Sequence, residues 1–192
     1  MNIPWTNWKL SFNAPVTLII IFVSLAIMIA ETIFGSAVVS LFSASNNFNF
    51  VNPFFYLGLI THPITHNGWT HFLSNVPFLL LLGPLLEEKY GFKKLLLIIF
   101  ITTILTGILN ALFFSTALCG ASGIVFLFIM LSSFANVKAK EVPLTFLLIA
   151  GLYIGQEVVN SLKPDNVSQF AHLLGGAFGS IFGFVFSEKN NR

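Results

Sequence analysis

Long apolar stretches that are almost free of charge follow one another along this 192-residue chain. Hydrophobic residues make up 56% of the sequence and charged residues only 8%, against roughly 25% charged residues in an ordinary soluble domain. A chain of this composition has too few polar side chains to cover a water-exposed surface. The composition therefore excludes a soluble globular protein and predicts a chain embedded in a lipid bilayer.

Six of the apolar stretches are long enough to cross a membrane. A helix that rises about 1.5 Å per residue needs roughly 20 mostly apolar residues to cross a hydrocarbon core of about 30 Å. We predict membrane spans at residues 16–34, 70–86, 95–114, 121–136, 143–160 and 167–186. No repeat or linker marks a second domain. We expect an all-α membrane protein whose residues 1–192 form one six-helix bundle.

The placement of positive charge predicts the orientation of this bundle, because loops rich in Lys and Arg stay in the cytoplasm. With the N-terminus inside, eight of the nine Lys and Arg residues fall on the cytoplasmic side and only Lys163 falls outside. Both termini are then cytoplasmic, in a multi-pass protein of the cell membrane. The stretch 35–68 contains no Asp, Glu, Lys or Arg, and we expect it to form a long outer loop in the membrane interface.

Charge and cysteine content exclude several kinds of partner. The formal net charge of +2 is far from the dense basic patch that nucleic acid binding requires. The single cysteine, Cys119, allows no disulfide within the chain and no cysteine-rich metal site. We therefore predict no nucleic acid partner, no metal and no cofactor.

Polar side chains inside the spans are few, and such residues are costly in hydrocarbon and usually functional. His71 and Asn75 lie four residues apart near the outer end of the second span, so they share one helix face. Ser122 lies in a run of small residues, 120–123, at the outer end of the fourth span. His172 lies about one turn into the sixth span. These four residues are therefore expected at the same depth in the bundle.

Small residues on the fourth and sixth spans would let a serine and a histidine meet. A nucleophilic serine needs a base within about 2.6 to 3.2 Å of its oxygen, so the two helices must approach closely. Rows of small residues permit such packing in membranes. The sixth span carries Gly175, Gly176, Gly179, Ser180 and Gly183, and the fourth begins with Gly120, Ala121, Ser122 and Gly123.

These motifs resemble those of the rhomboid family of intramembrane serine proteases. The markers are His-x-x-x-Asn in the second span, Gly-x-Ser-Gly in the fourth and Ala-His-x-x-Gly-x-x-x-Gly in the sixth, that is His71, Asn75, Gly120, Ser122, Gly123, Ala171, His172, Gly175 and Gly179. Residues 87–91 also look like the family's usual exit from the second helix, and His62 and His66 lie where the family often has histidines. The motifs occur in the family's order, in the matching spans and on one side.

The resemblance implies a catalytic dyad without a third acidic residue. His172 would take the proton from Ser122 and later return it to the leaving amine. The oxyanion would be bound by His71, the amide of Asn75 and the backbone N–H of Ser122. Phe126 matches the position of an aromatic ring, often Tyr, that stacks on the histidine.

The resemblance also implies the roles of the small residues and the kind of substrate. Gly120 and Gly123 would shape the site, and Gly175 and Gly179 would pack the helices. Substrates would be transmembrane segments of other proteins, cut near their outer end and entering past the fifth helix and the loop 160–168.

One difference from the family concerns the first outer loop. Many members carry a Trp-Arg pair there, whereas residues 55–59 of this chain read Phe-Tyr-Leu-Gly-Leu. We expect the missing Trp-Arg pair to affect the contacts of this loop with lipid and the rate of substrate cleavage. It does not affect the dyad or the oxyanion donors.

Other interpretations of the same residues remain open. The chain could be a catalytically inactive rhomboid-like protein that binds membrane clients, or a small transporter. A transporter needs a continuous polar path, whereas the polar residues here cluster in the outer third. A metal site at His62, His66 and His71 is disfavoured because Pro63 and the pair 67–68 interrupt the helix that it would need.

Overall fold

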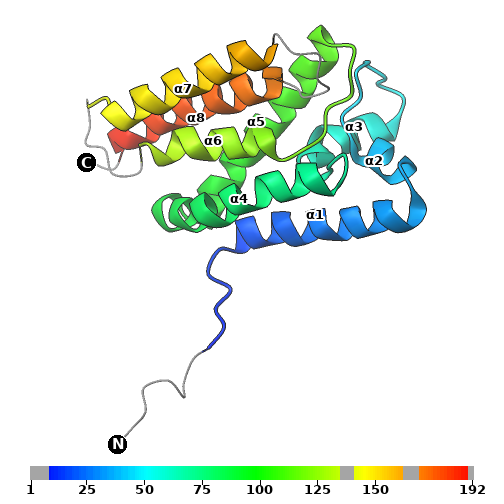
Figure 1. The fold of residues 1–192 in the computed structure, drawn as a ribbon, viewed down its shortest axis with the longest axis horizontal. Coiled ribbons are helices and arrows are strands. Elements are labelled where there is room, and N and C mark those ends of the chain that lie inside the picture. Colours follow the sequence, from blue (N-terminus) through cyan, green and yellow to red (C-terminus); the bar gives the residue numbers. More distant parts are fainter. Residues whose placement is uncertain (1–8, 135–140, 162–168, 190–192) are drawn as a thin grey trace, which may run out of the picture.

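The computed structural model describes residues 9–134, 141–161 and 169–189, and within them the regular structure is helical (Figure 1). The elements in chain order are α1 Pro15–Phe34, α2 Ala37–Phe42, α3 Pro53–Thr61, the 3-10 helix η1 His62–Ile64, α4 Trp69–Tyr90, α5 Phe92–Phe113, α6 Ser122–Ser132, α7 Leu144–Ser161 and α8 Gln169–Lys189. One isolated β-bridge joins Ala44 and Leu118. The predicted all-α class is confirmed.

Among the described residues, four helices are long and apolar enough to cross a membrane. They are α1, α4, α5 and the part of α8 from Gln169 to Phe186. The predicted span 121–136 corresponds to α6, which has only 11 residues, and residues 135–136 lie outside the described residues. The start of the predicted sixth span, 167–168, lies outside them as well. The described part of the chain therefore supports a membrane bundle with four helices of spanning length.

The stretch 35–68 differs from the expected loop, because it contains α2, α3 and η1. The side chain of Asn52 caps α3 by accepting the Phe54 N–H at 3.0 Å, and Pro53 occupies the first turn, where its missing N–H costs nothing. A Cβ on Gly58 would collide with the carbonyl oxygen of Ser43. The short helix α3 therefore packs directly on the chain that leaves α2.

A buried carboxylate joins α1 to α4. Glu87, which is 7% exposed, accepts the N–H groups of Val16 at 3.0 Å and Thr17 at 2.8 Å and the Thr17 hydroxyl at 2.8 Å. The first N–H groups of a helix have no partner within the helix, and the helix dipole favours negative charge there. Glu87 therefore caps α1 and fixes its start against the last turns of α4.

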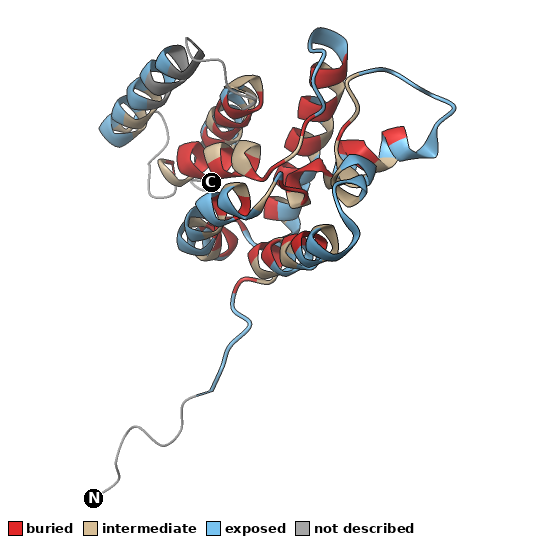
Figure 2. Ribbon diagram, turned by 45° about the vertical axis from the view of Figure 1, so that its right-hand side comes forward, coloured by how far each residue is buried: buried red, intermediate tan, exposed pale blue. Residues whose placement is uncertain are grey.

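The short helix α6 lies at the centre of the bundle and contacts α4, α5, α7 and α8. Leu127, Phe128 and Leu131 on α6 have no exposed surface. By contrast, α7 is mostly exposed, with Leu144 at 69% and Leu152 at 74% (Figure 2). The central helix α6 is thus fixed from several sides, whereas α7 has few contacts.

The elements that carry the predicted site begin at one end of the bundle. In Figure 1 the N-terminal ends of α4, α6 and α8 are directed to the right, the side of the molecule on which α2 and α3 lie. Lysines lie at the opposite end, in the last turn of α4 and the first turn of α5. The bundle therefore separates the polar site from the positive charge.

Candidate active site

Ser122 is the first residue of α6 and is half-buried. The chain reaches it through Gly120, whose φ of +113° is a conformation that side chains disfavour. A Cβ on Gly120 would lie 2.5 Å from Cε1 and 2.6 Å from Nε2 of His71. Gly120 is thus needed both for the turn and for the close approach of the His71 ring.

Two histidines from the segment before α4 hold the backbone that leads to Ser122. The carbonyl of His62 accepts the Gly120 N–H at 2.9 Å, and Nε2 of His66 accepts the Ala121 N–H at 3.2 Å. Nε2 of His62 donates to the carbonyl of Thr103 at 3.2 Å. In the sequence, only similarity to the family points to these two histidines. In the structure, both form hydrogen bonds with the loop before Ser122.

Both histidines are buried and neutral near pH 7. Burial lowers the pKa of His62 to about 4, against the opposing effect of the Thr103 carbonyl. Burial, together with charge on His71, lowers the pKa of His66 to about 3. An unprotonated Nε2 is what the Ala121 N–H requires as its acceptor.

The predicted oxyanion donors lie in the first two turns of α4. His71 is half-buried against Gly120, and its ring lies 5.2 Å from that of His66. Asn75 is 4% exposed and donates one amide N–H to the carbonyl of His71 at 2.8 Å. An amide has two N–H groups, so this bond orients Asn75 and uses only one of them.

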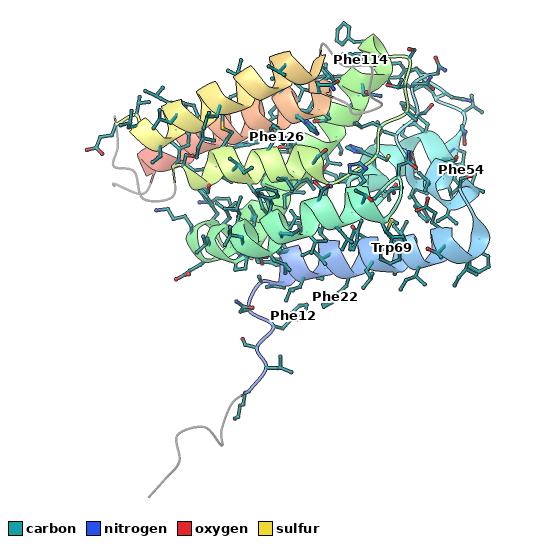
Figure 3. The ribbon with its side chains drawn as sticks, in the orientation of Figure 1. Phe12, Phe22, Phe54, Trp69, Phe114 and Phe126 are labelled. Carbon is teal, nitrogen blue, oxygen red and sulfur yellow. The ribbon has the colours of Figure 1, made fainter. Side chains whose placement is uncertain are left out.

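His172 lies flat against Phe126, with ring centroids 4.3 Å apart and planes within 10°. Phe126 is one turn beyond Ser122 on α6, and Figure 3 labels it where α6 faces α8. A Cβ on Gly175 would collide with the carbonyl of Gly123. The glycine contact between α6 and α8 therefore brings the imidazole to the first turns of α6.

A second glycine continues the contact between these helices. A Cβ on Gly179 would lie 2.6 Å from the carbonyl oxygen of Leu127 and 2.9 Å from Cβ of Met130. Side chains larger than hydrogen would separate the helices at these points.

The other residues considered in the sequence are Cys119, the histidines of the possible metal site and the gating loop. Cys119 is half-buried, and burial raises the pKa of its thiol, which disfavours the reactive thiolate. In residues 9–134, 141–161 and 169–189, no three His, Cys, Asp or Glu side chains are grouped to hold a metal ion. The predicted gating loop lies outside the described residues for 162–168.

A model of the rhomboid domain matches residues 53–189, which include every element of the site described above. The chain belongs to the rhomboid family. It is 25% identical over 134 residues to rhomboid protease GlpG of Haemophilus influenzae, a match that covers 67% of this chain and 69% of that protein.

Plant rhomboid relatives show higher identity over a smaller share of their length. RHOMBOID-like protein 4 of Arabidopsis thaliana is 34% identical over 130 residues, covering 62% of this chain and 31% of that protein. RHOMBOID-like protein 1 of the same plant is 34% identical over 131 residues, with 63% and 32% covered. The match therefore spans about a third of the length of these plant proteins.

Proposed function

We propose that this chain is an intramembrane serine endopeptidase that cuts transmembrane segments of other membrane proteins near their outer end. The observation that carries the proposal is the stack of His172 on Phe126, one turn from Ser122, at the glycine contact between α6 and α8. Rhomboid-family proteins are typically intramembrane serine proteases. The serine, the histidine and the small residues at the contact between their helices support the proposal that this chain shares that chemistry.

In the proposed reaction, Ser122 Oγ attacks the carbonyl carbon of the scissile peptide bond while His172 accepts the hydroxyl proton. The tetrahedral intermediate collapses when His172 returns this proton to the leaving amine, which leaves an acyl ester on Ser122. Water then attacks the ester, again with His172 as base, and releases the second product. Phe126 keeps the imidazole ring in one orientation through these steps.

The negative oxygen of the intermediate would be bound by His71, the free amide N–H of Asn75 and the backbone N–H of Ser122. Ser122 begins α6, so its N–H has no partner within that helix. One donor of this kind typically lowers the barrier by roughly 3 to 4 kcal/mol. Gly120 and Gly123 would shape the site, because Gly120 lets the His71 ring approach the loop before Ser122 and Gly123 lets α8 approach the first turn of α6.

An apolar groove between α4 and α7 gives the proposed route for the substrate. It has a volume of about 390 Å³ and is lined by Phe78, Leu81, Leu82, Ile129, Ser132, Ile149 and Leu152. Its lining suits a segment that arrives from the lipid, past α7 and the loop 160–168. Gly, Ala, Ser or Pro near the cut would ease unwinding of the segment, because these residues weaken a helix.

We further propose that residues 1–192 form a single six-span domain in the cell membrane, with both termini in the cytoplasm. The separation of the lysines from the site supports this orientation. The site then faces the outer leaflet, and lipid is the immediate neighbour of the apolar helix surfaces.

The proposal is tested by reconstituting the purified protein in liposomes with a panel of transmembrane segments that contain Gly-Ala pairs. We expect defined cleavage products from the wild type and none from Ser122→Ala or His172→Ala. A matched control is Ser133→Ala, since Ser133 directly follows α6 and its hydroxyl donates to the carbonyl of Ile129 at the far end of that helix. Products that persist in Ser122→Ala would contradict the proposal, and wild-type binding of segments without cleavage would favour the inactive client binder.

A further inference from the structure

A polar cavity lies at the same end of the bundle as the site but on other elements. Its volume is about 560 Å³, within the range of roughly 300 to 1,000 Å³ that is usual for small-molecule sites. Nine of its 14 lining residues are Ser or Asn, and none is charged. No residue of α4, α6, α7 or α8 lines it, so it is separate from the proposed substrate groove.

Two asparagines that line the cavity have side-chain N–H groups available as hydrogen-bond donors. Oδ1 of Asn49 accepts the N–H groups of Val51 and Asn52, and Oδ1 of Asn52 accepts the Phe54 N–H. Their oxygens are thus fixed by the local backbone. Within the described part of the chain, neither side-chain NH2 group donates a hydrogen bond to protein. Each amide therefore presents two N–H groups in a fixed orientation.

The edge of the cavity is strongly apolar. Phe50 is 69% exposed, Val51 93% and Phe54 53%, and all three lie within two residues of Asn49 or Asn52 in the chain. Figure 3 labels Phe54 at this end of the molecule. In a membrane protein, such side chains lie among acyl chains or at the interface. The cavity beside them is then at the level of the lipid headgroups.

We propose that this cavity binds the neutral sugar headgroup of a glycolipid. Hydroxyl groups both donate and accept hydrogen bonds, which matches a lining of amides and hydroxyls. A phosphate headgroup would call for Lys or Arg in the lining, and the lining holds neither. The apolar edge favours a sugar that is attached to acyl chains over a free saccharide.

The cavity wall continues into the loop that positions Ser122. Ala44 and Leu118 exchange backbone hydrogen bonds of 2.9 and 3.0 Å, and the amide of Asn46 donates to the carbonyl of Ser115. Cys119 lines the cavity and directly precedes Gly120. A bound headgroup would therefore shield Cys119, the single cysteine of the chain.

This shielding gives the test. The full-length protein is placed in phosphatidylcholine nanodiscs with monoglucosyl diacylglycerol, with the same mole fraction of diacylglycerol, or with diacylglycerol and free glucose, and the rate of Cys119 modification by a maleimide is measured. We expect the glycolipid to slow modification about fivefold, the factor 1 + [L]/Kd when the ligand is at about four times its Kd. Diacylglycerol and free glucose should leave the rate unchanged.

Matched variants test the named donors. Asn49→Asp with Asn52→Asp keeps the oxygens that cap the backbone and removes the NH2 groups, so protection by the glycolipid should be lost. The control Asn13→Asp changes an exposed residue outside the cavity and should keep the protection. Equal rates in all three wild-type nanodiscs, or protection that survives in the double variant, would overturn the proposal. Equal protection by free glucose would overturn the lipid source.

Discussion

Ser74 and Asn75 both donate a hydrogen bond to the carbonyl of His71 at 2.8 Å, yet only Asn75 is buried. Ser74 is exposed. If the second N–H of Asn75 binds the oxyanion, Asn75→Ala should lower kcat by roughly 100- to 1,000-fold with little change in KM. Ser74→Ala removes the same kind of helix contact and should leave kcat within about twofold. Equal effects of the two changes on kcat would show that Asn75 acts on the helix alone.

The buried histidines before α4 predict how stability depends on pH. The folded-state pKa values of His62 and His66, about 4 and about 3, lie below the ordinary value of 6.5. Below pH 6.5 the unfolded chain therefore binds more protons than the folded chain, and stability falls as pH falls toward 4. Each histidine contributes a slope of up to about 1.4 kcal/mol per pH unit in this window.

Thermal unfolding in detergent at a series of pH values measures this effect. We expect the melting temperature to fall from pH 7 to pH 4.5, and to fall less steeply in His66→Gln, whose amide oxygen can still accept the Ala121 N–H. A melting temperature that does not change with pH over this range would contradict the burial of neutral histidines.

At the scale of elements, the contact between α6 and α8 depends on particular glycines. A Cβ on Gly175 would collide with the carbonyl of Gly123, whereas a Cβ on its neighbour Gly176 would meet only Cγ of Met130, at 3.7 Å. Gly175→Ala should therefore destabilise the fold by roughly 1 to 3 kcal/mol, the usual cost of overpacking. Gly176→Ala should change stability by less than about 0.5 kcal/mol. Unfolding of both variants in SDS titrations compares them, and equal stability would contradict the contact.

The groove between α4 and α7 predicts that cleavage of a transmembrane substrate can be lost while Ser122 still reacts with a small reagent. Ser132 lies on the wall that α6 contributes to this groove, away from the first turn of α6. Ser132→Phe should block a transmembrane substrate and lower its cleavage at least tenfold, a loss of about 1.4 kcal/mol. Reaction of Ser122 with a small phosphonate should stay unchanged. A parallel loss of both activities would place the effect at the dyad and contradict the proposed route.

At the scale of the whole molecule, the lengths of the apolar stretches predict a membrane protein. The sequence motifs predict the rhomboid family. The boundaries of α6 were not predictable, because a central helix that is surrounded by other helices is apolar whether or not it spans the bilayer. The helices α2 and α3 were missed because an uncharged stretch carries weak periodicity, although Asn52-Pro53 is a usable start signal. The bonds of His62 and His66 to the loop before Ser122 join residues 55 to 58 positions apart, and local spacing cannot predict such contacts.

The central claim is that Ser122 is a nucleophile activated by His172, and one measurement tests it without a known substrate. The detergent-purified protein is treated with a fluorophosphonate, and the adduct is located by peptide mass spectrometry in the wild type, Ser122→Ala and His172→Ala. The account predicts a single adduct on Ser122 in the wild type and none in either variant. Equal labelling of all three proteins, or no labelling of a folded wild type, would contradict the claim.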